Sequence, residues 1–253
     1  MDASLLEAAP TNAAPMTAVA PATLLARAGR GRCPLALTLA LALALVGPTA
    51  VAADRDIDKV NGSITVEAGE RYGDLGTVNG SINIGAGARV ADAETVNGSI
   101  RVAENVQAGD LSTVNGSIRV ATNATVNDGI GTVNGSIFVD RGGNIRGDVE
   151  TVNGAIGLVD TDVGGGVETT NGDVTVGAGS HVKGGVRYVK PSKQWISFGK
   201  RKPPRVVIGP NARVDGPLVF EREVVLYVHG TARIGPVSGA TAVRYDGATP
   251  PAR

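Results

Sequence analysis

Aromatic residues are scarce in this chain of 253 residues, at only 3%. Glycine, by contrast, is abundant, with 36 residues. An ordinary globular core relies on large aromatic and aliphatic side chains, so this composition argues against one. A repetitive fold with a thin aliphatic core fits the composition better.

The chain has a single cysteine, Cys33, which lies in an N-terminal segment typical of a secretory signal peptide. Arginines precede an apolar run from Leu35 to Val46, and Ala50-Val51-Ala52 then predicts cleavage after Ala52 or Ala53. The alternative is a transmembrane anchor, but about 12 apolar residues are too few to span roughly 30 Å of hydrocarbon as a helix. Residues 1–53 are therefore expected to be signal peptide and N-terminal extension, with translation starting at Met1 or Met16. The mature chain would be exported and would contain no disulfide.

Charge is balanced overall, with 24 basic and 24 acidic residues, but it is unevenly distributed. Residues 54–180 hold 18 acids and 8 bases, whereas residues 181–253 hold 4 acids and 13 bases. The two halves therefore carry about −10 and +9. Such opposite charges favour head-to-tail contact between copies at low salt.

A six-residue motif, Thr-Val-Asn-Gly-Ser-Ile, occupies residues 77–82 and returns at 95–100, 113–118 and 132–137, with variants before and after. Steps of 18 or 19 residues separate successive copies. A period this regular indicates stacked structural units. The Asn residues of the motif are Asn61, Asn79, Asn97, Asn115, Asn134, Asn153 and Asn171.

Small aliphatic residues recur on a six-residue grid, and Ile-x-Val alternation, as at Ile100 to Val102, is typical of short strands. No stretch has a helical period. The pattern predicts an all-β, single-stranded parallel β-helix (β-solenoid) of about ten coils, each about 18 residues long and about 4.8 Å above the last. The grid of six matches left-handed β-helices. Parallel crossovers are overwhelmingly right-handed, however, and the 19-residue steps relax a threefold register, which favours the right hand.

The Asn-Gly pair is predicted to be a corner of the coil. Gly adopts positive φ without steric cost, and Asn tolerates the left-handed region better than most residues. Stacked Asn side chains would also hydrogen-bond along the rod. The Val before each Asn, such as Val96, and the Ile after it, such as Ile100, are expected to point inward.

The repeat breaks between Tyr188 and Arg205, where the chain's only Trp lies among prolines and basic residues. The predicted organisation is a solenoid over 54–187, an inserted loop over 188–205, final coils over 206–237 and a flexible tail over 238–253. The basic, aromatic segment is a candidate surface for an anionic glycan, an anionic lipid or the acidic flank of another copy. Export argues against nucleic acid, and a solvated loop that only covers the coil edge is the simpler alternative. The candidate binding residues are Lys183, Arg187, Lys190, Lys193, Trp195, Lys200, Arg201, Lys202 and Arg205.

The repeats Val-Asn-Gly-Ser-Ile and Thr-Asn-Gly-Asp-Val resemble those of exported bacterial adhesin-like β-helix proteins. Residues 207–216, Val-Ile-Gly-Pro-Asn-Ala-Arg-Val-Asp-Gly, are similar to the repeat of bactofilins, the polymer-forming β-helical cytoskeletal proteins. Together the similar segments cover roughly residues 58–237. The resemblance implies a β-helix and a structural or adhesive role. Bactofilins are typically cytoplasmic, and the signal peptide departs from that pattern.

Enzymatic chemistry has little support in the sequence. The six-residue grid also resembles that of hexapeptide acyltransferases, which use a His base, but His181 and His229 have no obvious acceptor pocket in the sequence. The nearest approach to an acidic cluster has no aromatic neighbour in sequence, and a calcium site there is the alternative to solvated coil edges. We therefore predict no catalytic residue, no cofactor and no metal. The clustered acids are Asp160, Asp162, Glu168 and Asp173.

These observations predict a non-enzymatic, exported structural or adhesive β-solenoid of the bacterial cell envelope, located in the periplasm or at the cell surface. A homo-oligomer or filament joined end to end is expected, because open solenoid ends are unpaired strand edges. The alternative is an envelope binding module that docks anionic glycan or lipid through residues 183–205.

Overall fold

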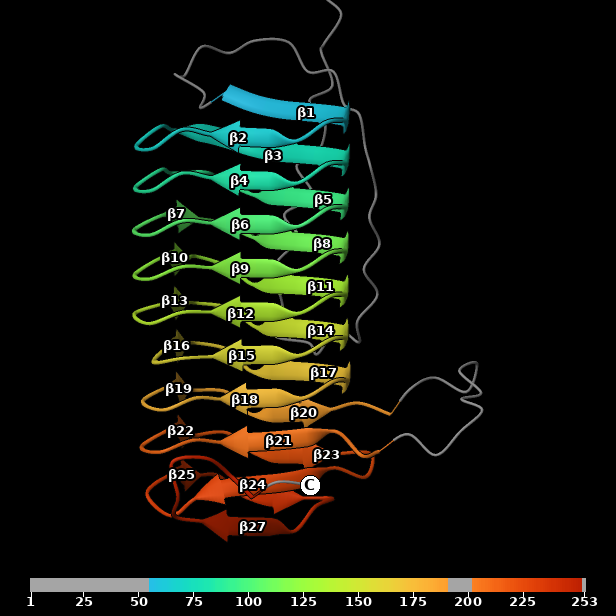
Figure 1. The fold of residues 1–253 in the computed structure, drawn as a ribbon, viewed down its shortest axis with the longest axis vertical. Coiled ribbons are helices and arrows are strands. Elements are labelled where there is room, and N and C mark those ends of the chain that lie inside the picture. The colour runs from blue at the N-terminus through green and yellow to red at the C-terminus, as the bar shows by residue number, and fades with distance from the viewer. Residues whose placement is uncertain (1–54, 191–201, 252–253) are drawn as a thin grey trace, which may run out of the picture. The chain divides into compact units, whose positions relative to one another are not determined.

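The structure is a computed structural model that describes residues 55–190 and 202–251. These residues form 27 β-strands and no helix (Figure 1). All strand pairs are parallel. Each strand inside a sheet pairs with its equivalents one coil earlier and one coil later, and the strands at the ends of a sheet pair on one side only. The predicted parallel β-solenoid of about ten coils is therefore confirmed.

The strands form three sheets, which we call A, B and C. Sheet A contains β1 (Arg55–Asn61), β3 (Tyr72–Asn79), β5 (Ala93–Asn97), β8 (Leu111–Asn115), β11 (Ile130–Asn134), β14 (Val149–Asn153), β17 (Val167–Asn171), β20 (Val186–Tyr188), β23 (Leu218–Phe220) and β26 (Val237–Ser238). Sheet B contains β2 (Ile64–Val66), β4 (Ile82–Ile84), β6 (Ile100–Val102), β9 (Ile118–Val120), β12 (Ile137–Val139), β15 (Ile156–Leu158), β18 (Val174–Val176), β21 (Arg205–Ile208), β24 (Val225–His229) and β27 (Ala242–Tyr245). Sheet C contains β7 (Gln107–Ala108), β10 (Thr125–Val126), β13 (Asn144–Ile145), β16 (Asp162–Val163), β19 (His181–Val182), β22 (Arg213–Val214) and β25 (Arg233–Ile234).

Each regular coil runs from sheet A through the Asn-Gly corner to sheet B, then through a tight turn to sheet C and back to sheet A. The 19-residue steps come from one extra residue at the corner between sheets C and A. Three residues, 127–129, join β10 to β11, whereas two residues, 109–110, join β7 to β8. The extra residue therefore lies outside the strands, and the register of the sheets is kept.

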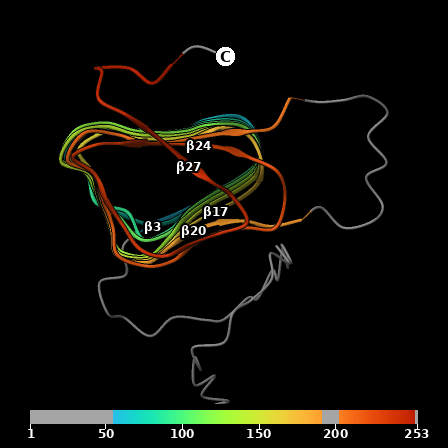
Figure 2. The same ribbon diagram turned by 90° about the horizontal axis from the view of Figure 1, so that it is seen from below.

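The two ribbon views together show the hand of the coil. In Figure 1 the strands of sheet B point left and those of sheet A point right, and in Figure 2 sheet B lies along the upper edge with sheet A below it. Seen from below, the chain therefore turns counter-clockwise while it advances toward the viewer. This is a right-handed coil, the hand favoured for parallel crossovers.

The core is a thin column of aliphatic side chains from all three sheets, such as Leu111, Ile118 and Val126, each at most 1% exposed. The expectation that the Val before each Asn points inward is wrong. Val96 is only half-buried, and Thr95 occupies the inward position instead at 3% exposure. Inward and outward positions alternate along β5, so Ala93 and Thr95 share the core face. The Thr95 hydroxyl is satisfied there because it donates to the Gly80 carbonyl oxygen at 2.9 Å.

The repeated Asn residues form a continuous ladder at the corner between sheets A and B. Each side-chain amide donates to the side-chain oxygen of the Asn one coil earlier at 3.0 Å, and six such bonds join the seven residues. Arg222 ends the ladder, since it donates to the Asn171 side chain and, at 2.7 Å, to the Thr170 carbonyl. Every amide therefore points the same way, which lets the bonds polarise one another.

The corner requires glycine mainly for space rather than for positive φ. A Cβ atom at Gly98 would lie 1.8 Å from the Gly80 carbonyl oxygen, and the same clash recurs along the stack. Gly80 and Gly98 do not have positive φ, whereas Gly62 (φ 109°) and Gly172 (φ 135°) at the same corner do. The turn between sheets B and C has further left-handed positions, and Asn105 (φ 59°) and Asn123 (φ 57°) occupy equivalent places there.

Two boundaries differ from the sequence-based organisation. Tyr188 is fully buried in β20 and Arg205 begins β21, so both belong to the solenoid rather than to the inserted loop. Residues 242–245, expected in the tail, form β27 because Leu226 and its neighbours in β24 offer a further edge for pairing. Residues 1–53, predicted to be a signal peptide and N-terminal extension, and residues 191–201 lie outside the described residues. Within the described ranges, no helix is long and apolar enough to cross a membrane.

Candidate functional site

The structure separates the described members of the predicted binding segment. Lys183 follows β19 on sheet C, Arg187 lies on sheet A, and Arg205 lies on sheet B. Arg187 forms an ion pair with Glu221 at 3.2 Å, and the Arg205 guanidinium lies 4.8 Å from the Tyr227 ring centroid. These three cations therefore face three different directions.

The remaining members lie beside the insertion or within it. Lys190 follows β20 and Lys202 precedes β21, and both are exposed. The other four, Lys193, Trp195, Lys200 and Arg201, lie outside the described residues. A binding surface over residues 183–205 thus stays a prediction, and Lys183 is the member that belongs to a different, fully described face.

That face is the outward side of sheet C, where side chains form a regular grid. Asn144 and Arg146 flank the inward Ile145, and the next two coils repeat this arrangement. Residues two apart on a strand point to the same side and are separated by about 6.6 Å, while successive coils are about 4.8 Å apart. The six outward positions, coil by coil, are Asn144 and Arg146, Asp162 and Gly164, and His181 and Lys183.

One position of this grid has no side chain, which creates a hollow. Gly164 lies between Arg146 in the coil before and Lys183 in the coil after, and the resulting space has a volume of about 410 Å³. We call it the sheet C hollow. It is lined by Asn144, Ile145, Arg146, Asp162, Gly164, His181 and Lys183.

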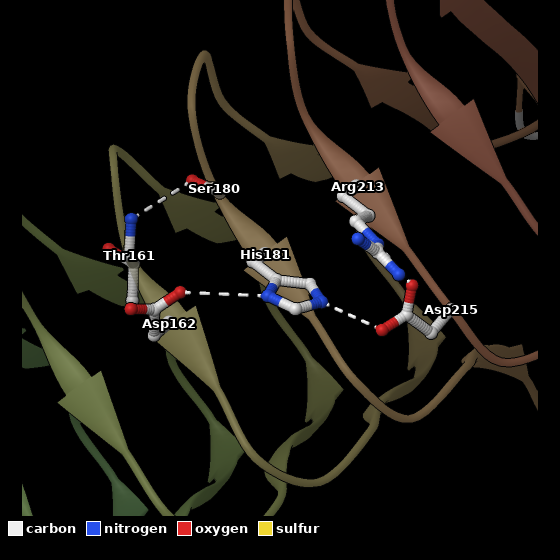
Figure 3. A network of polar contacts seen from close by, with 6 residues as sticks. All are labelled: Thr161, Asp162, Ser180, His181, Arg213 and Asp215. Atoms are coloured by element: carbon white, nitrogen blue, oxygen red, sulfur yellow. Dashed lines mark hydrogen bonds and ion pairs between the residues drawn. The ribbon is translucent and has the colours of Figure 1, made fainter.

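A polar network closes the C-terminal side of the hollow (Figure 3). The His181 Nε2 atom lies 2.8 Å from an Asp215 carboxylate oxygen, and Arg213 holds the other oxygen of that carboxylate. A carboxylate only accepts hydrogen bonds, so Nε2 carries the proton and donates it. The hydrogen bond from His181, and then that from Arg213, lowers the pKa of Asp215 below its usual range. On the other side, His181 Nδ1 lies 3.9 Å from Asp162, whose side chain is 67% exposed.

The network leaves Lys183 without an ion-pair partner among the described residues. Asp215 is its neighbour in the next coil, but that carboxylate is held by His181 and Arg213. Within the described ranges, neither Lys183 nor Arg146 forms an ion pair. Two exposed cations therefore face each other across Gly164.

Sheet A and the corner before it carry negative charge, opposite in sign to that of Arg146 and Lys183. The Asp92 carboxylate accepts the backbone N–H of Asp110 at 2.8 Å, and the same contact links earlier aspartates along the stack. Burial, followed by the charges of Asp92 and Glu94, raises the pKa of Asp110 to about 6. Burial, followed by the Glu168 charge, raises the pKa of Glu150 to about 7. This face therefore carries carboxylates that crowd one another.

The other predicted chemical sites do not come together. Asp162 lies on sheet C and Glu168 on sheet A, so the clustered acids of the sequence face different directions. Among residues 55–190 and 202–251, no group of three potential ligands is placed to hold a metal ion. His229 is 9% exposed and lies with its ring 5.0 Å from that of Tyr245, far in sequence from His181.

Three residues of the sheet C hollow, Asn144, Arg146 and Gly164, carry no individual signal in the sequence. They are found only by continuing the aliphatic grid around the coil, because each lies one position from an inward Ile145 or Val163. A comparison of the chain with family models, curated proteins and solved structures found no match.

Proposed function

We propose that this protein is a non-enzymatic, exported structural or adhesive solenoid of the bacterial cell envelope that associates end to end with further copies. The observation that carries the proposal is how the repeat uses its residues. Asn, Thr and Gly of each motif contact the next coil through hydrogen bonds or close packing. The polar groups of the repeated motif are thus used to hold neighbouring coils together, which is what a scaffold requires.

The ends of the solenoid support association. β1 is the first strand of sheet A, and all of its residues except Ile57 are exposed, with Val60 at 68%. No described strand covers its outer edge, and such an edge presents unpaired backbone donors and acceptors. In β1, Asp56 and Asp58 lie beside Arg55 and Lys59, whereas Arg233 and Arg244 lie in the last strands. The opposite net charges of residues 54–180 and 181–253, about −10 and +9, favour head-to-tail contact over head-to-head contact.

Sedimentation velocity at low and high salt tests this proposal. We expect association at low salt that is reversed at high salt, because charged contacts between exposed groups are screened. Asp56→Asn combined with Asp58→Asn should weaken the association, whereas Glu104→Gln combined with Asp140→Asn, which removes two charges from the middle of the stack, should not. A monomer at both salt concentrations would contradict end-to-end association.

A further inference from the structure

The sheet C hollow has the dimensions and the unpaired charges of a small binding site. Its volume of about 410 Å³ lies at the lower end of the roughly 300–1,000 Å³ typical of small-molecule sites. Arg146 and Lys183 are two coils apart, so their backbones are separated by about 10 Å. Both side chains are long enough to reach an anionic group placed above Gly164 from opposite sides. Such an anion would replace the ion-pair partners that the two cations lack.

The other outward position of each coil in the hollow, occupied in turn by Asn144, Asp162 and His181, has a different chemistry. Asn144 offers both a donor and an acceptor, while Asp162 offers only acceptors, and both are exposed. His181 offers Nδ1 toward the hollow side, because its Nε2 proton is committed to Asp215. These groups match hydroxyl groups, which donate to a carboxylate and accept from an amide. The Asp162 charge would repel a second anionic group at this position.

We propose that the sheet C hollow binds an acidic sugar, a ring that carries hydroxyl groups and a single carboxylate. The carboxylate lies between Arg146 and Lys183, where the guanidinium makes paired hydrogen bonds and the ammonium supplies a compact charge. The hydroxyl groups lie over Asn144 and Asp162. His181 is a positioning residue, since it keeps Asp215 away from Lys183. This inference is independent of end-to-end association, because the hollow lies on the side of the stack.

A simple anion site is the competing interpretation, and the two differ in the role of Asp162. The Asp162 carboxylate would weaken the binding of a sulfate or phosphate ion, because the charges repel. It would strengthen the binding of a sugar, because it accepts hydrogen bonds from the hydroxyl groups. Gly164 itself cannot be used as a probe. A Cβ atom there would lie 2.4 Å from the Arg146 carbonyl oxygen, so a larger residue would disturb the coil.

Isothermal titration of the protein with methyl galacturonoside, a single sugar ring with one carboxylate, tests the proposal, with the neutral methyl galactoside and sodium sulfate as comparison ligands at equal ionic strength. We expect the galacturonate to bind at least tenfold more tightly than either comparison ligand. Arg146→Gln combined with Lys183→Gln should reduce its affinity at least tenfold. The matched control, Arg101→Gln combined with Arg119→Gln, removes two exposed cations of sheet B and should change the affinity less than twofold.

Asp162→Ala separates the two interpretations. It should weaken galacturonate binding severalfold if hydroxyl groups lie over Asp162, and it should strengthen binding if only an anion is held. Circular dichroism melting of each variant verifies the fold. The proposal is overturned if galacturonate does not bind, if sulfate binds equally well, or if the sheet B control loses as much affinity as the sheet C variant.

Discussion

The substitution Gly116→Ala tests the close stacking at the Asn-Gly corner. A Cβ atom at residue 116 would lie 1.8 Å from the Gly98 carbonyl oxygen, whereas such contacts are essentially never shorter than 3.0 Å. The two coils would have to separate by more than 1 Å at this corner, and rotation cannot avoid the clash because the atom belongs to the backbone of the stack.

The loss of stability in Gly116→Ala can be estimated from the hydrogen bonds that break when the two coils separate. Between these two coils, the Gly98 N–H donates to the Asn115 carbonyl at 3.1 Å, and the Ile100 N–H donates to the Ser117 carbonyl at 3.1 Å. Losing two backbone hydrogen bonds beside a packed core costs about 1–3 kcal/mol each. We expect Gly116→Ala to reduce the free energy of unfolding by about 3–5 kcal/mol.

Gly131→Ala is the matched control, since a Cβ atom there has nothing within 4 Å. It should change stability by less than about 1 kcal/mol, and it should act in the stabilising direction because alanine restricts the unfolded chain. Urea unfolding followed by circular dichroism measures both variants, and hydrogen exchange locates the weakened coils. Equal stabilities of the two variants would refute the stacking at the corner.

Three further predictions follow from the core, the ladder and the acidic face. Val102→Asp should destabilise the protein by several kcal/mol through an unpaired buried charge. Val96→Asp, at a half-buried position, should destabilise it much less. Melting curves that rank the two variants in reverse would contradict the inward assignment of Val102. Asn115→Ala removes two exposed ladder bonds and should cost about 1–2 kcal/mol in urea unfolding, and no measurable loss would show that water replaces them. Because the pKa of Glu150 is raised from 4.5 to about 7, the folded state keeps a proton that the unfolded state releases, so stability falls as pH rises from about 4.5 to about 7. After allowance for solvent screening we expect about 1 kcal/mol from this group, and Glu150→Gln should flatten the pH profile of urea unfolding; an unchanged profile would contradict the raised pKa.

The spacing of Asn-Gly motifs predicts the stacking of coils because a side chain returns to the same environment at every step. The same spacing accounts for the chain of amide bonds from Asn61 to Asn171. It cannot decide which of two adjacent residues faces the core at a corner. Val96 is the more apolar residue, yet Thr95 is inside because its hydroxyl finds the Gly80 carbonyl. Hydrophobicity alone favours Val96 at the inward position. It fails because the hydrogen-bond partner of Thr95, the Gly80 carbonyl, belongs to another coil.

Predicting the candidate site from sequence is harder because it depends on neighbours between coils. Lys183 attracts attention as part of a basic segment, but Arg187 and Arg205 from that segment lie on other sheets. The hollow needs Arg146, 37 positions earlier in the chain, and a glycine between them. Only the register of sheet C places these residues together, and that register requires knowledge of every turn length in the intervening coils.

Electron microscopy of negatively stained mature protein tests the central claim most directly, namely that the Asn-Gly repeat builds a stiff scaffold that joins end to end. Ten strands in sheet A at about 4.8 Å per coil give a rod roughly 45 Å long. We expect linear chains of such rods at low salt and single rods at high salt. Isolated rods at both salt concentrations would contradict end-to-end assembly, and compact particles without a long axis would contradict the scaffold itself.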